Sequence, residues 1–218
     1  MGFRFKCVGL QLIVLLWVLP WGSIVGASNG DPAVAEITVL VHDTARISPS
    51  VLNRAELETA RIFRAAGIEI VWVNCSGESA NVDDECRHAP GVNQFLLHIV
   101  PTGKTSTDSV FGLAFLGEDG SGSYCDVFFD RIEEATRALD TNVSQLLGTV
   151  AAHELGHLLL GSHAHSRWGI MEPSWREEGL REIGMGTFLF SREQSALMKT
   201  RIGRDGLTLA SFRARTQR

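Results

Sequence analysis

The feature that most constrains this chain is the run of residues 151–173, AAHELGHLLLGSHAHSRWGIMEP. Residues four apart lie on the same face of a helix, so His153 and His157 can direct two imidazole nitrogens at one point. Glu154 is one residue out of phase with the pair, which suits its carboxylate to act as a base on a metal-bound water. The spacing therefore predicts a helix that carries a metal site.

Two further histidines, His163 and His165, follow this helix, and Gly161 between the two pairs is expected to end it. Zinc favours nitrogen ligands, and catalytic zinc sites use three protein ligands and leave the fourth position to water. Four of the seven histidines of the chain lie between positions 153 and 165. This clustering favours a metal site over a buried helix that carries histidines by chance.

The composition and the N-terminus indicate an exported globular protein. Hydrophobic residues make up 44% of the chain and charged residues 21%, which is a globular composition. Arg4 and Lys6 precede an apolar run at residues 8–19, and small residues follow up to Ala27. This pattern predicts a secretory signal peptide at residues 1–27. A retained membrane anchor is the alternative, but the apolar run is short for a spanning helix.

The charge balance argues against a nucleic-acid partner, which would need a basic patch. Residues 1–27 contain two basic residues and no acidic ones, so their removal takes the net charge from −5 to −7. We expect the mature protein to be an exported monomer, without stable membrane insertion, that acts on a protein or peptide.

The cysteines predict one disulfide and no zinc site. Cys75 and Cys86 flank a polar segment and could close a small loop in an oxidising compartment. Cys125 lies in an apolar, strand-like run, where a buried free thiol is expected. No C-x-x-C pair is present, so the cysteines are not expected to bind zinc.

Hydrophobic periodicity predicts the order strand, helix, four strands, helix and closing helix. The strand–helix–strand start predicts that the first two strands pair in parallel. Gly112 in the fourth strand is expected to mark a bulge or a close backbone approach. Asp140 or Thr141 is expected to cap the second helix, loops to fill residues 163–189, and residues 203–218 to form a basic, frayed tail. The strands are predicted at residues 35–42, 68–73, 95–100, 110–116 and 124–129, and the helices at residues 49–66, 143–160 and 192–202.

The histidine-rich run resembles the metzincin zinc peptidases, and among them the matrixins. Their signature is H-E-x-x-H-x-x-G-x-x-H, followed by a turn that carries a methionine beneath the metal. His153, His157 and His163 fall on the ligand positions, Glu154 on the general base and Met171 on the turn methionine. The resemblance covers about residues 35–202, but only residues 153–173 match specifically.

The resemblance implies an α+β fold with an α/β-like N-terminal part. It implies a mixed, twisted five-stranded sheet with two main helices, followed by a loop-rich C-terminal part with a closing helix. The peptidase domain would span residues 28–202. The cofactor would be Zn²⁺; matrixins also often bind structural calcium, but no residues of this chain are assigned to it.

The sequence departs from the signature at one position. The signature glycine would stand at position 160, which is Leu160 here, and the glycine comes one residue later at Gly161. The third ligand is therefore His163 or His165. His163 is favoured because its spacing to the first histidine and to the methionine matches the family.

The expected activity is that of a secreted zinc endopeptidase with Glu154 as general base. Zinc would lower the pKa of its bound water, and the carboxylate would pass the water proton to the leaving amine. Trp168, Trp175 and Phe188 are candidates either to line a substrate pocket or simply to pack. One alternative is a secreted zinc-binding module without proteolysis, although it would have no use for the glutamate. Another is an esterase or amidase with the same zinc chemistry.

Overall fold

The structure is a computed structural model, which describes the chain except for residues 1–33, 77–83, 104–109, 140, 176 and 217–218. The predicted signal peptide lies outside the described residues, as does Asp140, one of the two candidate caps. Within the described part of the chain, no helix is long and apolar enough to cross a membrane.

The core of the protein is a five-stranded mixed sheet with the strand order β2-β1-β3-β5-β4. The first four strands of this order pair in parallel, and β4 closes the sheet as an antiparallel edge strand. This arrangement confirms the predicted α+β class, the mixed sheet and the parallel pairing of the first two strands. The strands are β1 (Ala35–Asp43), β2 (Ile68–Asn74), β3 (Gln94–Val100), β4 (Gly112–Phe115) and β5 (Tyr124–Phe128).

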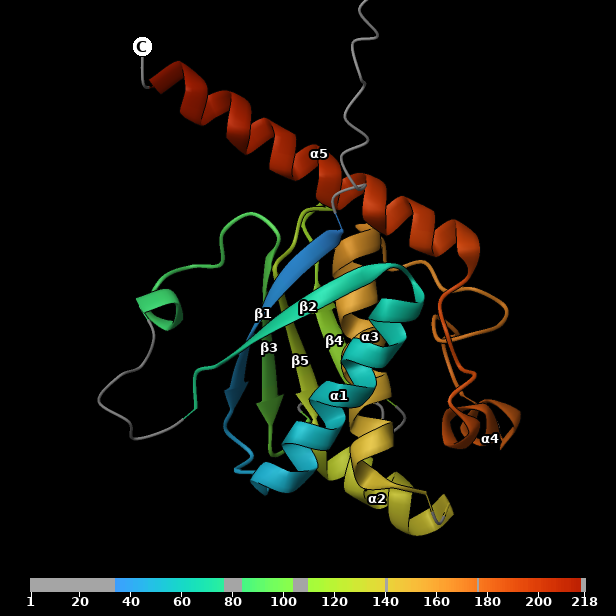
Figure 1. Cartoon of the computed structure of the whole chain (residues 1–218). Helices are drawn as coiled ribbons and strands as arrows, with labels where there is room; N and C mark the ends of the chain where they lie inside the picture. Colours follow the sequence, from blue (N-terminus) through green and yellow to red (C-terminus); the bar gives the residue numbers. More distant parts are fainter. Residues whose placement is uncertain (1–33, 77–83, 104–109, 140, 176, 217–218) are drawn as a thin grey trace, which may run out of the picture. The chain divides into compact units, whose positions relative to one another are not determined.

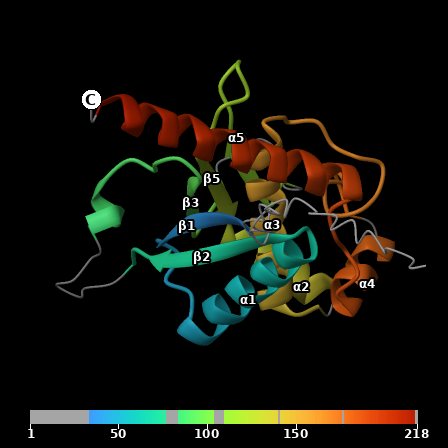
Figure 2. The same cartoon turned by 45° about the horizontal axis from the view of Figure 1, so that its top comes forward.

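Buried and partly exposed side chains alternate along the strands, and this alternation decides which face of the sheet the helices cover. In β3, Phe95, Leu97 and Ile99 are buried while the residues between them are partly exposed. Because side chains alternate between the two faces of a strand, the buried set lies on the helix-covered face. Figures 1 and 2 show the helices α1 (Pro49–Ala65) and α3 (Val143–Leu160) packed side by side on this face.

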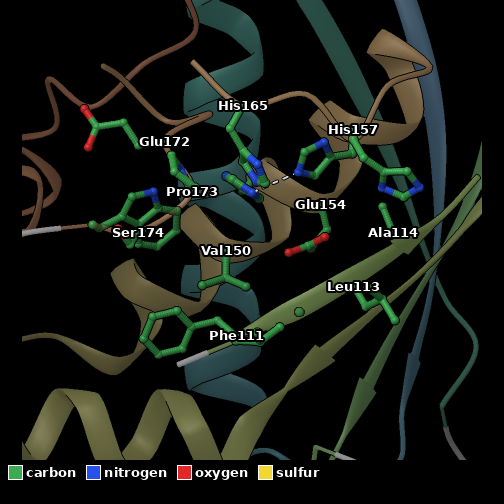
Figure 3. A pocket seen from close by; sticks show the side chains of 15 residues that line it. Phe111, Leu113, Ala114, Val150, Glu154, His157, His165, Glu172, Pro173 and Ser174 are labelled. Carbon is green, nitrogen blue, oxygen red and sulfur yellow. Dashed lines mark hydrogen bonds between the residues drawn. The ribbon is translucent and has the colours of Figure 1, made fainter. Parts of the chain in front are cut away.

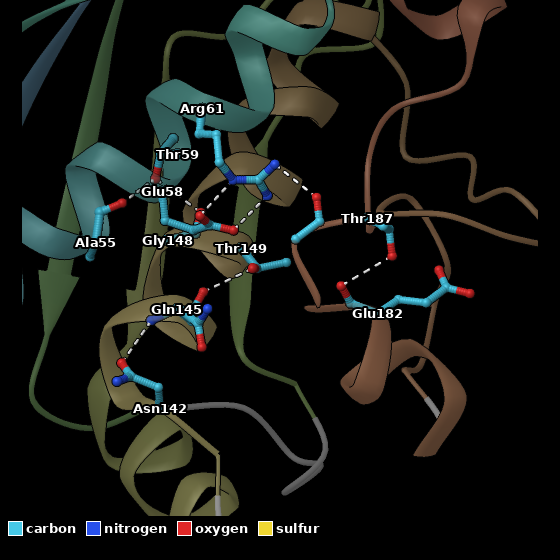
Figure 4. Close-up of polar contacts among 11 residues, drawn as sticks. Ala55, Glu58, Thr59, Arg61, Asn142, Gln145, Gly148, Thr149, Glu182 and Thr187 are labelled. Carbon is cyan, nitrogen blue, oxygen red and sulfur yellow. Dashed lines mark hydrogen bonds and ion pairs between the residues drawn. The ribbon is translucent and has the colours of Figure 1, made fainter. Parts of the chain in front are cut away.

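A close contact fixes α3 against α1. The hydroxyl of Thr59 on α1 donates to the carbonyl of Gly148 on α3 at 2.9 Å (Figure 4). A Cβ on Gly148 would lie 2.5 Å from the carbonyl oxygen of Ala55, so only glycine allows this approach. Helix α3, which carries the histidines, is therefore fixed closely against α1.

Two helices were not predicted, α2 (Phe129–Leu139) and α4 (Glu177–Met185). Phe129 was expected to end the fifth strand, but α2 begins there directly after β5, with no turn residue to mark the change. The cap of α3 is Asn142, not Thr141: its side-chain oxygen accepts from the backbone N–H groups of Ser144 and Gln145 at 3.0 and 3.3 Å.

The closing helix is also longer than predicted. Helix α5 (Arg192–Thr216) continues through most of the segment expected to be a frayed tail. Gly203 and Gly206 lower helix propensity in this segment but do not break the helix, and no proline follows Ile202. Helix α5 contacts β1, and the carbonyl of Ile202 accepts from the Asn93 side chain at 3.3 Å just before β3 begins.

The predicted disulfide and the predicted buried free thiol are confirmed. Cys75 and Cys86 form a disulfide with their Cα atoms 5.6 Å apart. Cys125 is a free thiol on β5 and is completely buried. The disulfide joins the end of β2 to the short 3₁₀ helix η1 (Asp84–Arg87).

Candidate metal centre

Helix α3 brings the two predicted ligands and the glutamate into the interior of the protein. The helix has the predicted bounds and is apolar on nearly all sides, so all its residues from Ser144 to Leu159 except Gln145 are buried. His153, Glu154 and His157 are only 8%, 5% and 4% exposed. Buried polar groups require partners, so the contacts of these three side chains reveal what the site can do.

The two helical histidines are held in one orientation by backbone carbonyls. His153 Nδ1 lies 2.6 Å from the carbonyl oxygen of Ile170, and His157 Nδ1 lies 2.8 Å from that of Ser162. A carbonyl can only accept, so both Nδ1 atoms carry the proton and both Nε2 atoms are left with a lone pair. Metal-binding histidines in proteins are oriented by the same kind of outer contact.

The unprotonated Nε2 atoms of His153 and His157 face each other at 3.1 Å. With both protons on Nδ1, this contact is not a hydrogen bond but an approach of two lone pairs. Zn–N bonds of 2.0–2.1 Å at a tetrahedral angle place two ligand nitrogens about 3.3 Å apart. The observed separation is close to the spacing of two nitrogens that share one zinc ion.

Burial also keeps these imidazoles in the neutral form that binds metals. Desolvation lowers the pKa of His153 to about 3, against the opposing effect of its hydrogen bond to Ile170. Burial likewise lowers the pKa of His157. A neutral imidazole offers a lone pair to a metal ion without first losing a proton.

The third histidine of the group is His165. His153, His157 and His165 each offer a nitrogen, and these atoms all lie within 4.8 Å of one another. The ring of His165 lies 5.4 Å from that of His153 and 4.9 Å from that of His157 between centroids. Among the described residues this is the group of histidines, cysteines and acids that could hold a metal ion.

His163, which the family spacing favours, lies outside this group. Its ring centroid is 6.1 Å from that of His157, and its side chain lines the same cleft as the three grouped histidines. Gly161 ends α3 in the left-handed conformation with φ of 64°, one residue later than the signature glycine.

Glu154 lies beside the histidines against the edge of the sheet. Desolvation raises the pKa of its carboxyl to about 8, and a hydrogen bond from the backbone N–H of Ala114 on β4 acts in the opposite direction. A nearby metal ion would favour the ionised carboxylate. The carboxylate is thus placed between the helix and β4, next to the space that the three histidines share.

Gly112 makes this position of the carboxylate possible. A Cβ at Gly112 would lie 2.7 Å from Glu154 Cγ, 2.8 Å from Glu154 Oε1 and 2.7 Å from the carbonyl oxygen of Asp126. The predicted close backbone approach at Gly112 is confirmed. The sequence did not reveal its partner, because nothing local links residues 112 and 154.

Met171 lies in a turn that packs against helix α3 at Gly156, between the two helical histidines. Gly169 has φ of 79°, and the N–H of Glu172 donates to its carbonyl at 3.0 Å. Met171 is fully buried, and its Sδ lies 2.9 Å from the position that a Cβ on Gly156 would occupy. Gly156 was not singled out from the sequence, although it lies between the two helical histidines and gives the methionine its place.

The histidines open onto a cleft of about 490 Å³ (Figure 3). One wall comes from β4 and the residues before it, and the other from the segment after the methionine turn. Of the three aromatic candidates, only Trp175 lines this cleft; Trp168 and Phe188 line a second cavity of about 500 Å³ that shares residues 172–174 with it. The residues that line the cleft are Val110, Phe111, Gly112, Leu113, Ala114, Val150, His153, Glu154, His157, His163, His165, Glu172, Pro173, Ser174 and Trp175.

Comparisons with known proteins add little to this description. No family model and no curated protein matches the sequence. A zinc-dependent peptidase from Methanocorpusculum labreanum (strain Z) is similar in structure, with 16% sequence identity and a TM-score of 0.47, over 74% of this chain and 99% of that one.

Proposed function

We propose that this protein is a zinc-dependent peptidase of the metzincin type. His153, His157 and His165 would hold the ion, and Glu154 would be the general base. The observation that carries the proposal is the pair of Nε2 lone pairs 3.1 Å apart, with the buried carboxylate of Glu154 beside them in an open cleft. A site that served only to stabilise the fold would need neither the cleft nor the carboxylate.

The donor set fits zinc better than the other common metal ions. Three imidazoles with a position left for water are typical of catalytic zinc, whereas magnesium and calcium select oxygen ligands. When bound, zinc lowers the pKa of its water toward about 7 and polarises a substrate carbonyl.

Glu154 would move the proton in peptide hydrolysis. Its ionised carboxylate accepts a proton from the attacking water and then donates it to the leaving amine. The hydrogen bond from Ala114 and the close approach of Gly112 hold the carboxylate in place for both transfers. No side chain is needed as nucleophile, because water is the attacking group.

The edge strand β4 suits an extended peptide as substrate. β4 pairs with β5 on one side only, and its other side faces the cleft. A peptide can add to such an edge as a further strand, with backbone hydrogen bonds for affinity and pockets for alternate side chains. Between β4 and Trp175, the cleft presents Val110, Phe111 and Val150 to an apolar side chain of the substrate.

We also propose that the mature protein is exported. The Cys75–Cys86 disulfide supports it, because such bonds persist in oxidising compartments and are rare in the reducing cytosol. The predicted cleavage after Ala27 is checked by sequencing the N-terminus of the protein recovered from outside the cytosol.

The test combines metal analysis with a peptide-library cleavage profile of residues 28–218. We expect one zinc ion per chain, cleavage that a chelator abolishes, and recovery when zinc is returned. Glu154→Gln should keep the zinc and lower kcat by about 10²–10⁴-fold, the usual contribution of a general base. Unchanged turnover in Glu154→Gln would refute the mechanism.

Other results of the same experiment would replace the proposal. Bound zinc without cleavage of any peptide would make the protein a zinc-binding module. Zinc-dependent hydrolysis of small esters or amides, but not of peptides, would make it an esterase or amidase.

A further inference from the structure

Trp175 contacts several parts of the candidate site, although the proposed hydrolysis gives this residue no role. It follows the methionine turn, is partly buried against the core and lines the cleft. Its contacts reach a proposed metal ligand, the carbonyl that orients this ligand, and the opposite wall of the cleft.

The first contact is a hydrogen bond to a shared carbonyl. The indole Nε1–H of Trp175 donates to the carbonyl oxygen of Ile170 at 3.3 Å. The same oxygen accepts the Nδ1–H of His153 at 2.6 Å. The peptide of Ile170 is itself held by the donation of its N–H to the carbonyl of Leu189 at 3.2 Å, and its side chain is fully buried. The acceptor that sets the orientation of His153 is thus fixed from several sides, one of which is Trp175.

The second set of contacts is made by the indole ring. Its edge-to-face contact with the His153 imidazole has a centroid separation of 5.7 Å and an interplanar angle of 78°. On another side it meets Phe188, which is only 2% exposed, at 5.5 Å and 85°. The indole is therefore held against the core, and it limits rotation of the imidazole away from the shared carbonyl.

The third contact crosses the cleft. The ring of Trp175 stacks on that of Phe111 with centroids 6.1 Å apart and an interplanar angle of 19°. Phe111 directly precedes β4, and its carbonyl accepts from the N–H of Phe128 at 2.8 Å, which fixes it to the sheet. A substrate side chain entering this part of the cleft meets the same indole that contacts His153.

We propose that Trp175 is a positioning residue for the metal centre. It holds the His153 imidazole in its ligand orientation through the Ile170 carbonyl and through ring contact, while the other side of its ring forms the cleft wall with Phe111. This inference rests on the proposed zinc site. Loss of an outer contact of this kind typically lowers metal affinity or activity about 10–100-fold.

The test is Trp175→Phe, which keeps an aromatic ring and removes the indole N–H. The zinc Kd is measured by competition with a chromophoric chelator, and the visible spectrum is recorded with cobalt in place of zinc. We expect the zinc Kd to rise about 10–100-fold and the cobalt bands to shift or broaden. Trp175→Tyr, which also lacks the indole N–H, is the second variant should the first not fold.

Two control variants separate positioning from general packing. Trp72→Phe makes the same change at another partly buried tryptophan, on β2 at the opposite edge of the sheet from β4, and should leave the zinc Kd unchanged. Phe111→Leu removes the stacking partner but keeps the indole hydrogen bond. It should change KM for peptides with a large apolar side chain and leave the zinc Kd within about twofold, well inside the 10–100-fold effect of a lost outer contact.

The outcomes distinguish this inference from the proposed function. If the unaltered protein binds no zinc, the proposed function fails, and the role of Trp175 fails with it. If the unaltered protein binds zinc and cleaves peptides, but Trp175→Phe keeps the zinc Kd and the cobalt spectrum, only the positioning role is wrong. A change confined to KM in Trp175→Phe would likewise reduce Trp175 to a cleft wall.

Discussion

Gly112→Ala tests whether the position of Glu154, the proposed general base, depends on the edge strand β4. The added methyl group would lie 2.7 Å from Glu154 Cγ, 2.8 Å from Glu154 Oε1 and 2.7 Å from the backbone carbonyl oxygen of Asp126. Neither neighbour yields easily, because Asp126 belongs to β5, which pairs with β4, and Glu154 lies on the buried helix α3. Either β4 shifts outward or the carboxylate leaves its position.

The size of the effect follows from this overlap. Overpacking a buried site typically costs about 1–3 kcal/mol of folding free energy. For a domain of this size each 1 kcal/mol lowers Tm by roughly 2–4 °C, so Tm should fall by roughly 2–12 °C. A displacement of a catalytic group by about 1 Å can reduce the rate on the order of 10²-fold. The zinc content should stay the same, because the three atoms nearest to the added methyl group belong to Asp126 and Glu154 and not to a proposed ligand.

The assay is thermal unfolding together with kcat/KM at saturating zinc, with Gly203→Ala as the matched control. A Cβ on Gly203 in α5 meets nothing within 4 Å, so this change should raise stability by about 0.5–1 kcal/mol and leave cleavage unaltered. If Gly112→Ala unfolds at the original Tm and cleaves at the original rate, the close approach of β4 to Glu154 has no bearing on catalysis, and the reasoning is refuted.

Three further predictions follow from the site and the fold. His165→Ala should remove the zinc and abolish cleavage, while His163→Ala keeps both, as measured by metal analysis and peptide cleavage. The reverse result would make His163 the third ligand, as the family spacing predicts. Replacing both Cys75 and Cys86 by serine should lower the free energy of unfolding by about 2–3 kcal/mol relative to the unaltered, oxidised protein, as measured by denaturant titration. An unchanged free energy of unfolding would contradict a stabilising disulfide. Zinc at a free concentration one hundredfold above its Kd should add about 2.7 kcal/mol to the stability of the metal-free protein, and no rise in Tm on zinc addition would contradict the site.

The sequence by itself determined the features that depend on local spacing. Helix α3 begins and ends where its apolar pattern and Gly161 predict, and the i, i+4 register of His153 and His157 brings their Nε2 atoms together. The alternating apolar runs placed the five strands to within one or two residues at either end. The disulfide followed from two cysteines at the ends of one polar loop. In each case the relevant partners are close in the chain, so periodicity and turn residues carry the information.

Only the tertiary structure decided how distant segments complete the site. His163 and His165 are two residues apart in the chain, and which one reaches the helical pair depends on how the loop is held: by His157 through the Ser162 carbonyl, and by Ser166, whose N–H donates to the Met171 carbonyl at 2.8 Å. Each of these bonds joins residues five apart in the chain, but in an irregular segment where no periodic pattern sets the path of the loop. Gly112 and Glu154 meet across 42 positions of sequence, and no local pattern encodes that contact. The spacing of residues in the sequence thus determines which side chains lie together on one face of a helix. The packing of other segments against the helix determines which residues contact those side chains.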